Sequence, residues 1–161
     1  IDSDAPLEVR KKSFMVRELI MLQKITGAWD STDVIRKAMS IFGGHGVMED
    51  FSSFPRLYRD AAINELWEGP RNVLLTQIHG DLKKVSQWYA FSEFIKDLLS
   101  GADPAVIKEF SAEIEELVSH PSLFTNDEKT LDVCRRWDSF CHRLFHAYQD
   151  CALAEAENQY L

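Results

Sequence analysis

Apolar side chains recur every three or four residues along most of this chain, and no other feature of the sequence constrains its fold as strongly. The clearest example lies near the C-terminus, where one apolar stripe is formed by Leu131, Cys134, Trp137, Cys141, Leu144, Tyr148 and Cys151. This spacing places side chains on one face of an α-helix, whereas a half-buried strand would alternate apolar and polar residues. We therefore predict an all-α protein with no strand.

Glycine and proline divide the apolar stripes into separate helices. The pattern predicts four principal helices, at about 7–42, 70–99, 103–119 and 126–159, and a short helix near 53–62. Gly27 lies inside the first of these, so the alternative is two helices that meet at Asp30 and Ser31. We expect the first two long helices to pack antiparallel and the last two to close over them, as in bundles with short loops.

Composition and charge exclude several classes of partner. The 161 residues are 45% hydrophobic and 27% charged, which is typical of one globular domain. No apolar run approaches the ~20 residues of a membrane-spanning helix, and no secretory leader is evident, so we expect a cytoplasmic protein without membrane contact. Residues 82–161 hold 8 basic against 14 acidic side chains. Nucleic-acid binding needs clustered positive charge, so we expect no such partner.

The stretch 42–77 contains the residues best suited to chemistry. Gly43, Gly44 and Gly46 follow an apolar helical pattern, where a helix must stop and where glycines let the backbone approach a ligand closely. Glu68 and Gly69 then precede Pro70, which suits the first position of a new helix. We expect the Glu68 carboxylate to lie at the mouth of a groove between the glycine turn and the second long helix, unpaired with any lysine or arginine.

Glu68 has the setting of a tunable base. The amides at a helix N-terminus favour its charged form, whereas an apolar pocket beside Trp67 would favour the neutral form. On the residues alone, the alternative that Glu68 only caps the helix stays open. We also expect the neighbouring Arg59 and Asp60 to order the loops around Glu68.

His142 and His146 stand four residues apart on one helix face, as in HExxH zinc sites. The position after the first histidine is Arg143 instead of glutamate, and no third ligand is evident. We therefore expect no metal site, and interpret the two histidines as residues that border the core.

Three segments of the stretch 42–77 resemble the C-terminal helical domain of the acyl-CoA dehydrogenases. These segments are a GGxG turn at Gly43–Gly46, a YRDARI-like segment at Tyr58–Ile63 and an IYEGT-like segment at Leu66–Pro70, and they occur in the family's order and spacing. The resemblance covers residues 17–82 and is nearest to the family's bacterial adaptive alkylation-response branch. It implies an antiparallel helical region at 1–100 with a helical tail at 101–161.

The resemblance also implies roles for individual residues. Glu68 matches the glutamate that removes the α-proton of an acyl-CoA thioester, while Gly43, Gly44, Gly46 and Gly69 match positions near the flavin, FAD. The family's glycine turn approaches the cofactor of a neighbouring subunit, so dimers or tetramers are implied. The family's N-terminal and β domains have no counterpart here, and we expect the chain to be part of a longer protein.

Three departures from the family pattern affect cofactor binding. Ser40, Pro70 and Leu74 replace a glutamine, a threonine and a second glutamine that normally help to hold the flavin. We therefore expect this chain alone to bind no FAD and to be inactive. A second interpretation is a helical assembly or interaction module that keeps the family's scaffold without turnover.

Overall fold

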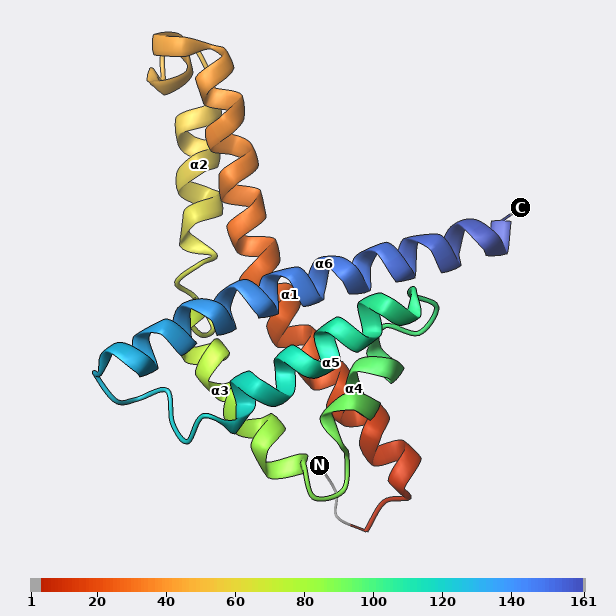
Figure 1. The fold of residues 1–161 in the computed structure, drawn as a ribbon. Coiled ribbons are helices and arrows are strands. Elements are labelled where there is room, and N and C mark those ends of the chain that lie inside the picture. The colour runs from red at the N-terminus through yellow and green to blue at the C-terminus, as the bar shows by residue number, and fades with distance from the viewer. Residues whose placement is uncertain (1–3, 161) are drawn as a thin grey trace. The chain divides into compact units, whose positions relative to one another are not determined.

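The chain folds into α-helices joined by short loops (Figure 1). The computed structural model describes residues 4–160, and in that range it contains no strand. In chain order the elements are α1 (Leu7–Ile41), the 3-10 helix η1 (Gly43–Val47), α2 (Phe54–Ile63), α3 (Arg71–Val85), α4 (Phe91–Leu98), α5 (Pro104–Ser119) and α6 (Glu128–Tyr160). The all-α prediction is confirmed.

One predicted helix is wrong. The range 70–99 was expected to be continuous, but it is divided into α3 and α4 by a turn at 86–90. The amides of Trp88 and Tyr89 both donate to the carbonyl of Val85, and Ala90 is extended with a ψ of 146°. The apolar stripe continues through the turn because Val85, Tyr89 and Phe94 are all buried, so spacing alone does not reveal the break.

Gly27 does not interrupt α1. The helix runs through it without a break, so the alternative of two helices meeting at Asp30 and Ser31 is wrong. A Cβ added to Gly27 would meet no atom within 4 Å. No close contact therefore requires a glycine at this position.

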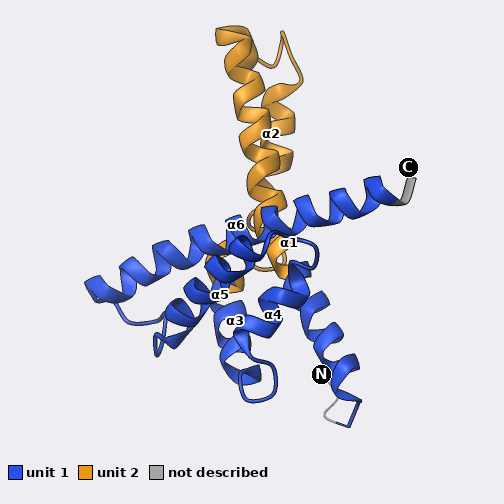
Figure 2. Ribbon diagram, turned by 45° about the vertical axis from the view of Figure 1, so that its right-hand side comes forward, with its two compact units in different colours: residues 1–20, 75–161 blue, residues 21–74 orange. Residues whose placement is uncertain are grey.

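The chain divides into two compact units (Figure 2). Unit 1 comprises residues 1–20 and 75–161, and unit 2 comprises residues 21–74. The helices α1 and α3 each contribute residues to both units. The expected division into a family-like region at 1–100 and a helical tail at 101–161 that packs on it stays a prediction.

Unit 1 is built around an aromatic cluster that joins α1 to α4. The ring of Phe14 meets the rings of Tyr89 and Phe94 edge-on, with centroids 6.1 and 5.7 Å apart. Edge-to-face pairs of this kind stabilise a core beyond the area that they bury. The Tyr89 hydroxyl donates to Asp97 at 2.8 Å, so its polar atom is satisfied as its ring is buried.

Ion pairs show the direction in which α1 runs relative to α3 and α4 within unit 1. Lys11 of α1 pairs with Glu93 at 2.6 Å, and Arg17, further along α1, pairs with the earlier Asp81 at 2.7 Å. Partner numbers fall as α1 advances, so α1 runs antiparallel to α3 and α4, as predicted.

The helices α5 and α6 both pack on α3. His79 of α3 contacts the carbonyl of Leu117 at 3.3 Å, and the indole N–H of Trp137 donates to the carbonyl of Leu75 at 2.8 Å. Burial lowers the pKa of His79, which keeps this contact uncharged at neutral pH. Within unit 1, α5 and α6 thus cover α3, which is part of the second long helix that they were expected to cover.

The most unusual side chain of unit 1 is Glu18. It is fully buried, and within residues 4–160 neither of its carboxyl oxygens has a hydrogen-bond partner. The guanidinium of Arg17 lies 3.9 Å away and already pairs with Asp81. Burial, and then the charge of Asp81, raise the pKa of Glu18 to about 8, so the side chain carries a proton at pH 7.

We predict that Glu18 makes the fold less stable as the pH rises. Its folded-state pKa of about 8 exceeds the ordinary value of 4.5, so the folded chain holds the proton more tightly than the unfolded chain. The resulting stability is complete below pH 4.5 and is lost as the pH rises through 8, by at most about 1.4 kcal/mol per pH unit. In urea titrations, Glu18→Gln should raise the midpoint at pH 8.5 relative to the native chain.

Glu115→Gln is the matched control, because Glu115 is an exposed side chain of α5. It should leave the pH dependence of unfolding unchanged. A Glu18→Gln midpoint that falls with pH as steeply as the native one would show that another group causes the dependence.

Candidate functional site

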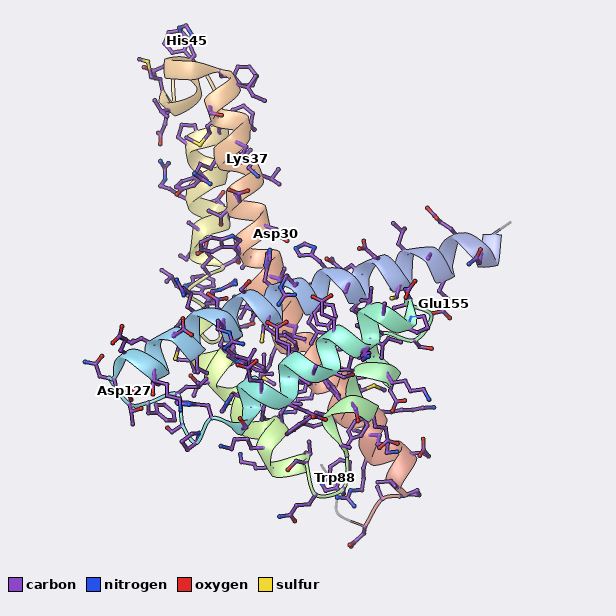
Figure 3. The ribbon with its side chains drawn as sticks, viewed as in Figure 1. Asp30, Lys37, His45, Trp88, Asp127 and Glu155 are labelled. Carbon is purple, nitrogen blue, oxygen red and sulfur yellow. The ribbon has the colours of Figure 1, made fainter. Side chains whose placement is uncertain are left out.

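The predicted site residues all lie in unit 2, on two turns. The first turn is η1, which follows α1 directly, and His45 marks its position in Figure 3. The second turn links α2 to α3 and contains Glu68 and Gly69. Each turn interrupts the α-helical backbone where the sequence predicted a break.

The structure requires glycine at two of the three η1 positions, for different reasons. Gly46 packs so tightly on α1 that an added Cβ would lie 2.2 Å from the carbonyl oxygen of Met39. Gly43 has a φ of +55°, which side chains disfavour. At Gly44 neither reason holds, because its φ is ordinary and no atom lies within 4 Å of an added Cβ. The backbone at Gly43 and Gly44 is open on that side and could be approached by another molecule.

Glu68 has a strained backbone. Its φ is +55°, and no other non-glycine residue in the described part of the chain has a positive φ. Conformations of this kind cost on the order of 1 kcal/mol or more and cluster at functional sites. Gly69 follows with a φ of +105°, and Leu74 fills the space beside it, 2.9 Å from an added Cβ. The turn is therefore set by Glu68 and Gly69 together.

The surroundings of Glu68 are only partly as expected. Among residues 4–160 its carboxylate makes no ion pair. It is exposed, however, and its neighbours Leu66 and Trp67 are 67% and 62% exposed. Unit 2 therefore presents Glu68 next to two exposed apolar residues in the sequence but does not itself enclose it.

The groove predicted between the glycine turn and Glu68 is not formed within unit 2. The 3-10 helix η1 packs at the start of α2, where the rings of Phe42 and Phe54 lie 5.2 Å apart, whereas Glu68 follows the end of α2. The 10 residues of α2 span about 15 Å, and Figure 1 shows the two turns at opposite ends of that helix. The reason is that α2 runs straight between the two turns.

The expected role of Arg59 is also wrong. Arg59 pairs with Glu49, at 2.5 Å, and so ties α2 to the loop that follows η1. The Glu68 turn is held instead by two cations that sequence reasoning missed. Arg71 donates to the carbonyl of Ile25 at 3.1 Å, and Lys24 donates to the carbonyl of Asn64. These partners lie 46 and 40 residues apart in sequence, and no local pattern indicates them.

Arg71 has a second contact that fixes the start of α3. Its guanidinium lies over the ring of Trp29, 5.2 Å from the centroid. A cation above an indole face is attracted by the electron density of the ring. The turn containing Glu68 is thus anchored to α1 on its C-terminal side.

The fit of unit 2 to a flavin is partial. The open backbone of Gly43 and Gly44 could lie against the cofactor. The three replaced positions provide no such contact, because Ser40 donates to the carbonyl of Lys37 at 2.6 Å and Leu74 is buried beside Gly69. Pro70 has no N–H to donate. The backbone features suited to the cofactor are therefore present, and the polar side chains that would anchor it are replaced.

His142 and His146 lie side by side on α6, in unit 1, with ring centroids 4.6 Å apart. Their rings meet at 74°, which is an edge-on contact. The absence of a metal site stays a prediction.

Comparison with known proteins agrees with the motif order in residues 42–77. Residues 7–82 match the family described as acyl-CoA dehydrogenase, C-terminal domain. "Acyl-CoA dehydrogenase family member 11" of Caenorhabditis elegans is 33% identical over 63 residues, which are 39% of this chain and 10% of that protein. "Putative acyl-CoA dehydrogenase AidB" of Escherichia coli (strain K12) is 37% identical over 68 residues, or 42% of this chain and 11% of that protein.

The chain therefore spans about a tenth of the length of the curated relatives that it matches. The comparison with solved structures gave no match. Among the described residues, none of the helices combines the length and the apolar character needed to span a bilayer.

We predict that Gly46 and Gly44 respond differently to alanine. At Gly46→Ala the new Cβ would collide with the backbone of Met39, so the turn must shift, and we expect a loss of about 2–3 kcal/mol in unfolding free energy. Gly44→Ala is the matched control and should change that free energy by less than about 0.5 kcal/mol. Urea unfolding followed by circular dichroism measures both, and equal losses would contradict the close packing of Gly46 on α1.

Proposed function

We propose that this chain, whose residues 7–82 match the acyl-CoA dehydrogenase C-terminal domain family, forms the C-terminal helical part of an acyl-CoA dehydrogenase-like flavoprotein. In this proposal Glu68 removes the α-proton of an acyl-CoA thioester. The observation that carries the proposal is the strained backbone of Glu68, at a φ of +55°, in the turn that matches the family's glutamate.

The environment of Glu68 is suited to a base that becomes strong when substrate binds. A carboxylate locked to a lysine or arginine would have a lowered proton affinity, and Glu68 has no ion pair among the described residues. Its exposed neighbours Leu66 and Trp67 offer apolar surface that an acyl chain or another part of the protein could cover. Covering them would exclude water and raise the basicity of the carboxylate.

The proposed roles of the glycines follow from their geometry. Gly43 and Gly44 would lie against FAD through their open backbone, and Gly46 would hold them in place through its packing on Met39. Gly69 would allow the turn that presents Glu68. When FAD is bound, it supplies the acceptor for the hydride that leaves the β-carbon of the substrate.

The surface of unit 2 supports assembly with other domains or subunits. Its exposed large apolar side chains are Trp29, Val34, Ile41, Phe42, Val47, Met48, Phe51, Leu57, Ile63, Leu66, Trp67 and Val73. Apolar surface on this scale is typical of interaction sites. We therefore propose that unit 2 packs against N-terminal and β domains of the family type, and that the complete protein forms a homo-oligomer.

A second candidate function is a helical assembly module without turnover. The replacement of polar flavin contacts by Pro70 and by the buried Leu74 favours it, and so does the local hydrogen bond of Ser40. The full-length protein distinguishes the two functions. A yellow protein that acyl-CoA bleaches supports the enzyme, whereas a colourless one supports the module.

We predict that Glu68→Gln in the full-length protein abolishes catalysis and preserves the fold. Glutamine keeps the size of the side chain and removes its basicity, so bleaching of the flavin by acyl-CoA should slow by about 10²–10⁴-fold. Stopped-flow absorbance measures this rate, and flavin content and unfolding midpoint should stay unchanged. Glu65→Gln, three residues earlier, is the control and should bleach at the native rate.

Two results would contradict the assignment. If the Glu68→Gln protein bleached as fast as the native one, the base would lie elsewhere. If it lost stability with its flavin content, Glu68 would be a structural cap for α3.

We also predict that the isolated chain leaves free FAD unchanged. The two open glycines offer few contacts without polar anchors, so the fluorescence of added FAD should keep its free value in a titration with the chain. Retention of one FAD per chain through gel filtration would show that the replacements at Ser40, Pro70 and Leu74 matter less than their chemistry suggests.

A further inference from the structure

A pocket in unit 1 has a charge opposite to that of the whole chain. It has a volume of about 340 Å³ and lies where the first turns of α1 face the C-terminal end of α3 and the turn at 86–90. Trp88 marks it in Figure 3. Its lining includes Arg10, Arg17 and Lys84 as cations, and Asp81 as its one carboxylate. We call this the Arg10–Trp88 pocket.

The cations of the pocket outnumber the negative charge that could neutralise them. Asp81 uses one oxygen for Arg17, at 2.7 Å, and the other for Lys84, at 3.1 Å. Both of its oxygens are therefore engaged. Glu18 lies against Arg17, but its pKa of about 8 leaves it neutral at pH 7. The pocket therefore keeps an excess of positive charge in a chain whose net charge is −8.

Arg10 is the cation with unused hydrogen-bonding capacity. Its guanidinium lies over the ring of Trp88, 4.2 Å from the centroid, and it forms no ion pair with residues 4–160. Its Nε atom is shielded from water and has no hydrogen-bond partner in the described part of the chain. An unpaired buried donor is unfavourable, and a ligand oxygen would satisfy it if the Arg10 side chain shifted to bring Nε to the surface of the pocket.

The remaining lining is apolar. Phe14, Val85 and Trp88 complete the pocket, and Phe14 and Val85 are buried in the core of unit 1. A pocket that combines an apolar wall with a few convergent polar groups is typical of small-molecule sites, which start at about 300 Å³. The pocket therefore suits a ligand with a compact apolar body and an anionic head.

We propose that the Arg10–Trp88 pocket binds a small organic oxyanion, whose carboxylate or phosphate pairs with Arg10 and Lys84 while its apolar body lies against Trp88 and Val85. None of these residues belongs to the stretch 42–77, so the pocket is a site additional to the one that contains Glu68. The guanidinium fork suits carboxylate and phosphate alike.

Isothermal titration of the chain at pH 7 tests the proposal with four probes. Phenyl phosphate and benzoate carry both an aromatic body and an oxyanion, benzyl alcohol carries only the body, and inorganic phosphate carries only the charge. We expect saturable one-to-one binding of at least one of the first two, weaker at high salt. Benzyl alcohol and inorganic phosphate should bind at least about tenfold more weakly, since each lacks one of the two contacts.

Matched variants locate the binding. Arg10→Gln should lower the affinity for the tighter-binding of phenyl phosphate and benzoate by about tenfold or more, because a charge-assisted hydrogen bond is lost. Lys12→Gln makes the same charge change two residues away at an exposed side chain outside the pocket, and should leave affinity unchanged. Lys84→Gln, whose side chain is 78% exposed, should weaken binding as well, and it keeps the test decisive if Arg10→Gln fails to fold.

Three results would overturn the proposal. The first is no saturable binding of phenyl phosphate or benzoate up to about 10 mM. The second is an equal loss of affinity in Lys12→Gln and Arg10→Gln, which would indicate a general effect of charge. The third is binding of benzyl alcohol or inorganic phosphate as tight as that of the aromatic anions. The ranking of phenyl phosphate against benzoate identifies the preferred head group.

Discussion

The antiparallel pairing of α1 with α3 is the constraint on which both described sites depend. In unit 1 the pairing is fixed by Arg17 and Asp81, at 2.7 Å. In unit 2 it is fixed by Arg71, which bonds the carbonyl of Ile25. The first contact places the cations of the Arg10–Trp88 pocket beside one another, and the second holds the start of α3 just after Glu68. Each site thus depends on a contact between α1 and α3 within its own unit.

Much of the fold could be predicted from the sequence because its signals are local. The start of α5 is an example, since Asp103 accepts a hydrogen bond from the amide of Ala105 at 2.7 Å and Pro104 follows it directly. Asp103 and Pro104 are adjacent in the sequence and indicate the helix start without any knowledge of the fold. The break between α3 and α4 has no such signal, because 86–90 contains neither glycine nor proline. There, burial of Tyr89 with Phe14 determines the backbone.

In the candidate site, too, local sequence signals predict the elements but not the tertiary contacts between them. Sequence reasoning placed the two turns and Glu68 correctly along the chain, but it expected the turns to meet. A helix of 10 residues keeps them apart, and spacing in sequence does not tell which way a chain turns after a glycine. The partners of Arg59 and Arg71 were missed for a related reason. A long cation can reach several acceptors, and tertiary packing decides which one it meets.

The buried carboxyl of Glu18 has a consequence for handling the protein. The chain has an isoelectric point near 5.1, so mutual repulsion between molecules is weakest in mildly acidic solution, where association and precipitation are favoured. The proton on Glu18 makes that same range the one in which this side chain opposes folding least. As the pH rises above the isoelectric point, repulsion between molecules increases, whereas the stabilisation contributed by the Glu18 proton decreases. A buffer well above the isoelectric point, which keeps the protein dispersed, therefore removes the stabilisation that the protonated Glu18 contributes.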